Sequence, residues 1–230
     1  MSLCHWRSGR RNRHRVSYTD QVASSSAPDD PRASLRTEQV AQTRAALVAA
    51  GRLLFGRSGF AATPVEDLVR EARVTTGALY HHFPNKAALF EAVFEQVHVE
   101  LLIASAQATA DLAEGAVEWF TAGFDAFLDK VLEPDVQQIM ITDAPAVLGL
   151  ARFTEMDERY AYAAIVAGLQ AATAAGVLRV EDPQTLARLL LGALTRAGML
   201  IANSAEPRAT RDAVAATLRA LINGFAATPE

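Results

Sequence analysis

Few residues of this sequence have the types and spacing that catalysis requires. Gly56-Arg57-Ser58-Gly59 is one residue short of the Gly-x-Ser-x-Gly nucleophile motif, and it ends a predicted helix instead of following a strand. Neither a Gly-x-x-x-x-Gly-Lys phosphate loop nor a His-Glu-x-x-His zinc motif occurs. The acidic clusters around Glu114 and Asp157 are typical of solvated helix faces. The sequence therefore predicts no enzymatic activity.

The adjacent histidines His81 and His82 carry the nitrogen atoms that most often bind metals. Side chains of neighbouring helical residues point about 100° apart, and no His or Cys partner stands at ligand spacing. Cys4 is the single cysteine, so no disulfide can form within the chain, which fits a reducing cytoplasm. We expect no metal site and no cofactor.

Hydroxyl-bearing and small side chains follow one another at Thr75-Thr76-Gly77-Ala78, where a short helix is predicted to begin with Thr75 as its N-cap. Such a helix start lets the backbone approach base edges in the major groove of DNA. The preceding short helix is expected to begin with a capping box, in which the Thr63 hydroxyl accepts a hydrogen bond from the Glu66 amide. Pro64 is expected to be the first helical residue.

Four predicted helices position these residues. The first runs from Ser34 to about residue 56, with Gly59 as a left-handed stop. Short helices follow over about 64–72 and 75–83, and Asn85 caps a longer one that begins at residue 86. Two short helices joined by a tight turn form a helix-turn-helix unit, although such hairpins are also common in helical cores.

The order and spacing of about a dozen residues over some 50 positions resemble the signature of the TetR family of bacterial transcription regulators. The matching positions are Gly59-Phe60, Thr63, Leu68-Val69, Ala72, Val74-Thr75, Gly77, Leu79-Tyr80, His82-Phe83, Lys86 and Leu89. The resemblance implies an all-α, dimeric protein. Its three-helix DNA-binding head would span residues 35–90, with the motif at about 64–83, and a larger helical body for ligand binding and dimerisation would span 91–230.

The resemblance also implies a set of DNA contacts. Residues 76–78 would read base edges, Tyr80, His82 and Lys86 would hold phosphates, and His81 would touch either a base or a phosphate. Tyr80 and His82 could instead form a partly buried aromatic pair. The full implied set is Arg44, Thr63, Thr75, Thr76, Gly77, Ala78, Tyr80, His81, His82 and Lys86.

Arg73 departs from the family pattern, which has glycine in the turn. If the turn needs a positive φ, Arg73 carries a strain of about 1 kcal/mol. Alternatively, Arg73 lies on the DNA side as an extra cation.

Charge is distributed unevenly along a chain whose net charge is −4. Residues 1–34 carry six Arg against three Asp, residues 35–90 carry seven basic against four acidic groups, and the remainder carries nine basic against nineteen acidic groups. A cationic front suits docking on a polyanion by one end. The first 34 residues show no hydrophobic period and are predicted to be a disordered Arg/Ser-rich tail. Three roles for this tail stay open: an arm that binds DNA, an organellar transit peptide, and a passive tail or an over-long predicted start of the protein.

Beyond residue 90, helical patterning continues, and Pro134, Pro145, Gly176, Pro183 and Pro207 divide it into shorter helices. An aromatic set could line an effector pocket, although such a set is more often plain core. The candidates are Trp119, Phe120, Phe124, Phe127, Met140, Phe153, Tyr160 and Tyr162.

The last two helices are predicted to form a four-helix bundle between two chains, the alternative being packing within one chain. The candidate dimerisation residues are Leu190, Ala193, Leu194, Ala197, Leu218, Leu221 and Phe225. No apolar run reaches the roughly 18 residues that span a bilayer.

The resulting hypothesis is a cytoplasmic, homodimeric, sequence-specific DNA-binding regulator that a small molecule releases from a palindromic operator. The alternative is a DNA-binding regulator without a small-molecule ligand, controlled by its abundance or by a protein partner.

Overall fold

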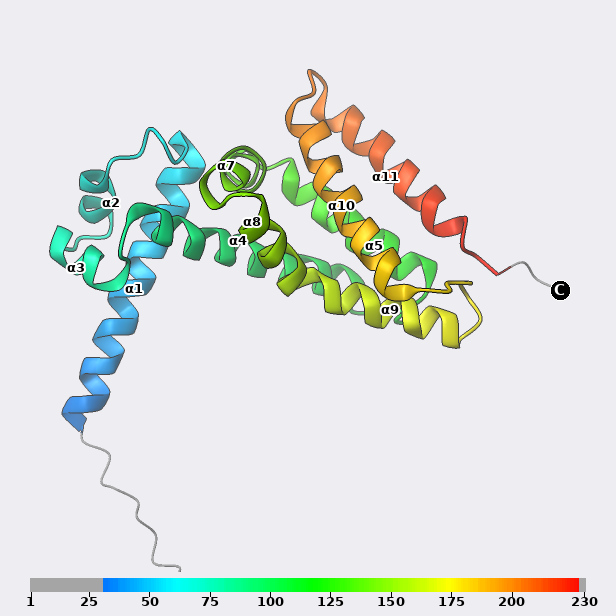
Figure 1. Ribbon diagram of the computed structural model, residues 1–230, viewed down its shortest axis with the longest axis horizontal. Helices are drawn as coiled ribbons and strands as arrows, with labels where there is room; N and C mark the ends of the chain where they lie inside the picture. Colours follow the sequence, from blue (N-terminus) through cyan, green and yellow to red (C-terminus); the bar gives the residue numbers. More distant parts are fainter. Residues whose placement is uncertain (1–30, 228–230) are drawn as a thin grey trace, which may run out of the picture. The chain divides into compact units, whose positions relative to one another are not determined.

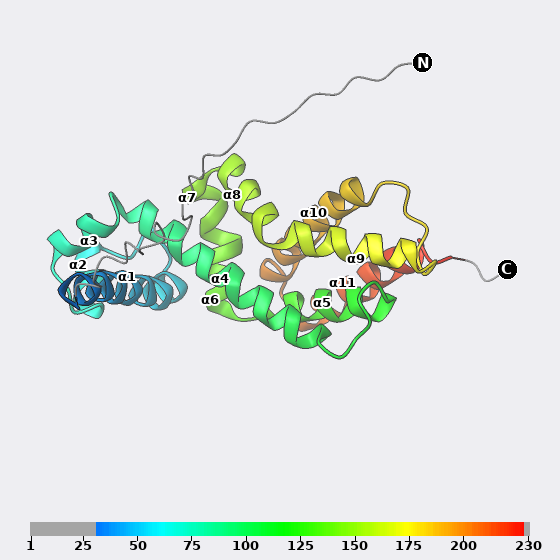
Figure 2. The ribbon, with the colours of Figure 1, turned by 90° about the horizontal axis from the view of Figure 1, so that it is seen from below.

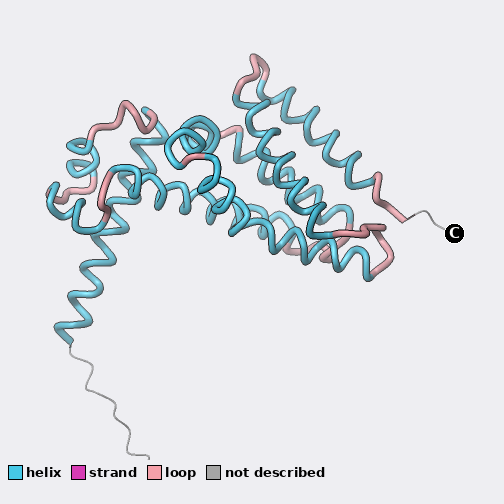
Figure 3. Tube along the Cα trace, viewed as in Figure 1, coloured by secondary structure: helices cyan, strands magenta, loops and turns pink. Residues whose placement is uncertain are grey.

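The computed structural model describes residues 31–227, and every regular element in that range is a helix (Figure 3). Leu178 and Ala226 form one isolated bridge. The helices are α1 (Pro31–Ser58), α2 (Val65–Glu71), α3 (Thr76–His82), α4 (Lys86–Thr109), α5 (Val117–Val131), α6 (Pro134–Val136), η1 (Gln137–Asp143), α7 (Ala144–Leu148), α8 (Leu150–Asp157), η2 (Glu158–Tyr162), α9 (Ala163–Ala174), α10 (Pro183–Ala202) and α11 (Pro207–Asn223). The predicted all-α class is confirmed. Helix α1 begins at Pro31, three residues before the predicted start, and the rest of the predicted tail lies outside the described residues.

The head packs α2 and α3 against α1 and the first turns of α4 (Figure 1). One leucine from each helix is fully buried, namely Leu47, Leu68, Leu79 and Leu89. Each such side chain contributes about 1.5–3 kcal/mol by leaving water. These leucines therefore fix the two short helices, which would not be stable alone.

The body is built around α5, α9, α10 and α11, whose apolar faces share one core. Figure 2 shows α9 and α10 on the same side of this bundle. Helix α10 is the one described helix that is long and apolar enough to cross a membrane, with a mean hydropathy of 1.4. Seven of its residues are buried in the body core, as expected for a core helix.

Two segments of the body, η1 and η2, are π-helices. A π-helical turn widens the backbone by one residue and is frequent at functional sites. Met140 lies on η1 and Tyr160 on η2, and both side chains line the same cavity. The predicted breaks also occur, since Pro134, Pro183 and Pro207 stand at the starts of α6, α10 and α11.

Candidate nucleic-acid interface and body cavity

Helix α3 turns its small and hydroxyl residues to solvent. Leu79 is fully buried and Phe83, which follows the helix, is nearly so. Residues 75–77 are exposed, and the Ala78 amide donates to Thr75 Oγ1 at 3.1 Å. The predicted N-cap role of Thr75 is therefore confirmed, as is that of Asn85, whose side chain accepts from the Ala88 amide.

The aromatic and imidazole rings of α3 are not packed as a buried pair of Tyr80 and His82. Tyr80 is 50% exposed, and the His82 ring instead contacts His81, with centroids 5.4 Å apart. Arg44 on α1 is also exposed, and its guanidinium lies 5.2 Å from the centroid of Phe83. Such a cation–π contact holds the arginine stem while leaving N–H groups free for other acceptors.

Lys86 is partly buried, and its side chain binds the loop between α1 and α2. Its ammonium donates to the carbonyls of Phe60 at 2.8 Å and Thr63 at 3.0 Å, and lies 4.2 Å from the Phe60 ring centroid. An ammonium has three donors, so two are used by the loop before α2. Lys86 therefore holds that loop, and its contact with a phosphate stays a prediction.

The capping box expected at Thr63 and Glu66 is wrong. Helix α2 begins at Val65 with Pro64 as its N-cap residue, and no side chain caps it. Thr63 is 2% exposed, and its hydroxyl donates to the Gly59 carbonyl at 2.7 Å. The chain turns at Gly59, whose φ is 81°. The acceptor of the Thr63 hydroxyl is therefore a carbonyl that precedes it in the chain, and not an amide of α2. A buried hydroxyl is also unsuited to the DNA contact that the resemblance implied for Thr63.

Arg73 has a φ of 55°, the single positive value among described residues other than glycine. The turn between α2 and α3 thus needs the left-handed conformation that the sequence raised as a possibility. The Arg73 side chain is exposed. Backbone strain and an exposed cation therefore occur together at this residue.

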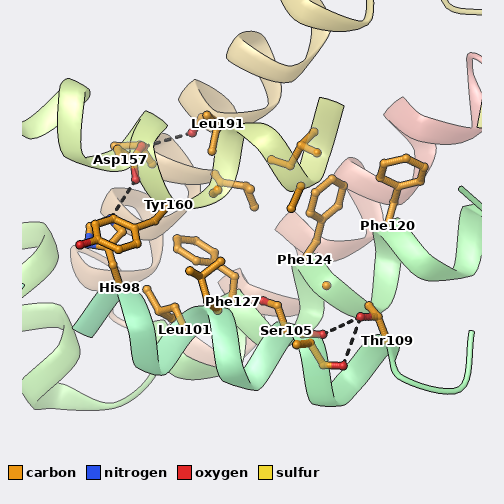
Figure 4. Close-up of a pocket in the computed structure, with 18 of the residues that line it drawn as sticks. His98, Leu101, Ser105, Thr109, Phe120, Phe124, Phe127, Asp157, Tyr160 and Leu191 are labelled. Carbon is orange, nitrogen blue, oxygen red and sulfur yellow. Dashed lines mark hydrogen bonds and ion pairs between the residues drawn. The ribbon is translucent and has the colours of Figure 1, made fainter. Parts of the chain in front are cut away.

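A cavity of about 270 Å³ lies inside the body (Figure 4). Its walls come from α4, α5, η1, α8, η2, α9 and α10 and are mostly apolar. Six of the predicted residues line it: Trp119, Phe120, Phe124, Phe127, Met140 and Tyr160. Phe153 does not, because its ring packs against Phe94 in the neighbouring core, and Tyr162 lies under Arg188 instead.

The polar end of the cavity was not expected from the sequence. His98 Nδ1 lies 3.1 Å from the Phe94 carbonyl and Nε2 lies 3.3 Å from Asp157 Oδ1. Thr195 Oγ1 lies 3.2 Å from Asp157 Oδ2. Asp157 had been assigned to a solvated helix face, and that assignment is wrong. The one available signal was His98 itself, a histidine on the apolar face of a helix.

Tyr160 closes the same end of the cavity. Its ring stacks on His98 with centroids 5.2 Å apart, and its hydroxyl donates to Glu95. Burial, together with the hydrogen bond to the Glu95 carboxylate, raises the pKa of Tyr160 to about 12. The phenol therefore stays neutral and keeps donating at neutral pH. Within residues 31–227, no group of three His, Cys, Asp or Glu side chains is placed to hold a metal ion.

The predicted dimerisation set divides between two faces of α10 and α11. Leu190, Leu194 and Leu218 are buried in the body core of the chain itself, and Leu218 also lines a groove between α10 and α11. Their part in an interface between two chains stays a prediction. The helical period places Leu189 and Leu200 outward, 66% and 46% exposed. Leu221 on α11 is also half exposed, and Phe225 packs partly against the core. Ala193 and Ala197 line a groove between α10 and α11.

Polar contacts join the head to the body. The Phe60 amide, in the loop before α2, donates to Asp143 Oδ2 at 2.7 Å, and Asp143 is the last residue of η1. Arg52 on α1 bridges Glu100 on α4 at 3.1 Å and Asp135 on α6 at 2.6 Å. Helix η1 therefore carries both a cavity residue, Met140, and a contact with the head.

Two family models match this chain. The model described as bacterial regulatory proteins, tetR family, matches residues 47–93, and the model described as tetracyclin repressor-like, C-terminal domain, matches residues 117–225. The first covers the helices around α3, and the second covers the body from α5 to α11.

Individual proteins agree with these matches. A TetR-family transcriptional regulator from Pectobacterium atrosepticum is 35% identical, with a TM-score of 0.74, over 84% of this chain and 98% of that one. The transposon Tn10 TetC protein from Escherichia coli is 28% identical over 67% of this chain and 78% of its own length. RolR, solved with its ligand resorcinol, is 20% identical with a TM-score of 0.66 over 81% and 90% of the two chains, and shares the fold.

Proposed function

We propose that this chain, which belongs to the TetR family of DNA-binding transcription regulators, is a cytoplasmic homodimeric repressor that a small molecule releases from a near-palindromic operator. The observation that carries the proposal is the largely apolar cavity of the body, with Met140 of η1 in its wall and Asp143 of the same helix bound to the head.

The DNA contacts are proposed for the exposed side of α3. Thr76, Gly77 and Ala78 would face base edges, with Ala78 able to meet a thymine methyl. Tyr80, His81 and His82 would contact the backbone, as would Arg44 and the third N–H of Lys86. The exposure of residues 75–77 and of Tyr80 supports this arrangement.

A homodimer is proposed through α10 and α11. Leu189, Leu200 and Leu221 expose large apolar side chains on these helices, and a groove between the helices includes Ala193 and Ala197. Burying such a stripe against its own copy would remove apolar area from water, at about 25 cal/mol per Å². Two heads held this way would meet two half-sites of one operator.

Ligand release requires that the effector bind the free form better than the DNA-bound form. The route proposed runs along η1, because a ligand against Met140 would move a helix whose last residue holds the Phe60 amide. The bridge from Arg52 to Glu100 and Asp135 provides a second link between α1 and the body.

The test begins with selection of bound duplexes from a random DNA library by the full chain. The proposal expects an inverted repeat whose binding weakens steeply with salt. Tyr80→Phe should weaken binding to all selected sequences equally, whereas Thr76→Ala should change which bases are selected. Absence of any enriched repeat would refute operator recognition. A repeat that no cavity ligand releases would instead favour the regulator controlled by abundance or by a protein partner.

A further inference from the structure

We infer that the body cavity takes an uncharged aromatic molecule of one or two rings that carries a hydroxyl group, and that it rejects carboxylates. This inference rests on the proposed small-molecule site. It goes further by naming the chemistry of the ligand from the shape, charge and hydrogen-bond inventory of the cavity.

The size of the cavity limits the ligand to a small molecule. A cavity of roughly 150 Å³ holds one benzene ring, and this one measures about 270 Å³. The side chains of Trp119, Phe120, Phe124 and Phe127 supply flat walls from α5. Aromatic rings stack or meet edge to face with such walls. One ring, or two fused rings, therefore fits better than a long chain or a bulky multi-ring molecule.

The polar end of the cavity has more acceptors than donors. The Thr195 hydroxyl has one hydrogen but lies near two acceptors, Asp157 Oδ2 at 3.2 Å and the Leu191 carbonyl at 3.1 Å. The Tyr160 hydroxyl donates outward, to Glu95. A ligand that brings its own O–H group to Asp157 would supply the missing donor.

The charges at this end favour a neutral ligand. The Phe94 carbonyl can only accept, so His98 Nδ1 donates to it, while Nε2 lies 3.3 Å from Asp157 Oδ1. Both ring nitrogens of His98 are therefore directed at acceptors of the protein, and the ring offers no free N–H to a ligand anion.

Among residues 31–227, no Lys or Arg lines the cavity. A ligand carboxylate would therefore be buried beside Asp157 without a cation of its own, which is strongly unfavourable. The remaining polar groups of the wall are neutral: the hydroxyls of Ser105 and Thr109 on α4 and the indole N–H of Trp119 on α5. Thr109 already donates to the Ser105 carbonyl (Figure 4). Neither polar region of the wall thus supplies a Lys or Arg charge that would balance a buried anion.

The experiment uses three probes of nearly the same shape, namely 2-naphthol, 2-naphthoate and naphthalene. Isothermal titration calorimetry on the full chain measures their dissociation constants at neutral pH. We expect 2-naphthol to bind at least about tenfold more tightly than naphthalene, which lacks the donor. It should bind at least about a hundredfold more tightly than 2-naphthoate, which brings a charge. Tighter binding of 2-naphthoate, or binding of none of the three, would overturn the inference.

Two variants assign the discrimination to the polar end. Asp157→Asn should weaken the binding of 2-naphthol by about tenfold, because it removes the carboxylate that accepts the ligand hydroxyl. It should also reduce the difference in affinity between 2-naphthol and 2-naphthoate. Glu158→Gln is the matched control, since it removes the neighbouring charge from a residue outside the cavity. Thr195→Val provides a second variant of the same shape without the hydroxyl. Unchanged 2-naphthol binding in both Asp157→Asn and Thr195→Val would contradict the assignment.

Operator release by each probe separates this inference from the proposed function. If 2-naphthol binds but leaves the selected DNA bound, the ligand class stands and ligand-controlled release fails. If 2-naphthoate binds and releases DNA, release stands and the ligand class fails.

Discussion

Arg73 occupies the turn of the helix-turn-helix with a backbone conformation that glycine adopts without strain. Its amide donates to the Arg70 carbonyl, and the Val74 amide donates to the Val69 carbonyl, so the left-handed residue closes the end of α2. Its exposed guanidinium has no role in this geometry. Backbone and side chain at residue 73 can therefore be varied separately.

We predict that Arg73→Gly raises the free energy of unfolding by about 1 kcal/mol, because the strain is removed. Urea denaturation followed by circular dichroism measures the change. Arg73→Ala is the control, since it removes the charge but keeps the positive φ, and it should give no stabilisation. If Arg73 also contacts a phosphate, both variants will reduce the salt dependence of DNA binding by similar amounts. Equal stability of the two variants would refute the strain.

Tyr160 has a pKa of about 12 when folded, above the value of about 10 expected for the unfolded chain. The neutral phenol is thus favoured by folding. Its contribution to stability is complete below about pH 10 and is lost as the pH rises towards 12.

We predict that an absorbance titration at the wavelength of tyrosinate, comparing the wild type with Tyr160→Phe, yields a difference curve with a midpoint near pH 12. Tyr80→Phe serves as the comparison, because Tyr80 is half exposed. A Tyr160 midpoint at the ordinary value would mean that its hydroxyl is not held by Glu95.

At the scale of elements, η1 carries two contacts only three residues apart, one with the cavity and one with the head. Met140 faces the cavity, and the carboxylate of Asp143 accepts the amide of Phe60. Hydrogen bonds to a charged acceptor contribute about 1.5–3 kcal/mol. This contact is therefore strong enough to hold the loop before α2 in place.

We predict that Asp143→Ala speeds hydrogen exchange of the Phe60 amide by at least about tenfold, because the acceptor is lost. Amide exchange read by mass spectrometry or NMR measures this. Asp143→Asn keeps an oxygen acceptor at the same place and should retain most of the protection. Equal exchange in the wild type and Asp143→Ala would show that the contact does not restrain the loop.

Features that depend on neighbouring residues could be predicted from the sequence, whereas features that depend on tertiary packing could not. The caps at Thr75 and Asn85 and the stop at Gly59 depend on neighbouring residues, so they were predicted correctly. The prediction that the Thr63 hydroxyl caps α2 was wrong, because its hydrogen-bond partner depends on how the loop between Gly59 and Thr63 folds. The polar end of the cavity was not predicted for a related reason, since His98 and Asp157 come into contact only when α4 and α8 pack together.

The two faces of α10 show the same limit. A run rich in leucine and alanine predicts a helix but does not say which stripe faces the core of its own chain. Leu194 proved to line the cavity, while Leu189 points outward. The aromatic set was predicted well because α5 is strongly amphipathic, so its rings had to converge on one side.

At the scale of the whole molecule, the outward leucines of α10 and α11 predict the oligomeric state. We expect the double variant Leu200→Glu with Leu221→Glu to be monomeric at micromolar concentration, because charge on both helices opposes burial against a second copy. Light scattering after size-exclusion chromatography measures the mass. Leu150→Glu is the control, since Leu150 is 76% exposed on α8 and lies outside the groove. A dimeric double variant would place the interface elsewhere.

Helix α4 runs without a break from Lys86, beside the loop of the head, to Thr109 at the cavity. It buries Leu89 and Phe90 in the head and offers His98 and Leu101 to the cavity. Because one hydrogen-bonded rod serves both regions, neither can melt without exposing apolar surface of the other. The head and body should therefore form one cooperative folding unit with a single calorimetric transition, and a molecule bound in the body would raise the melting temperature of the head that it does not touch.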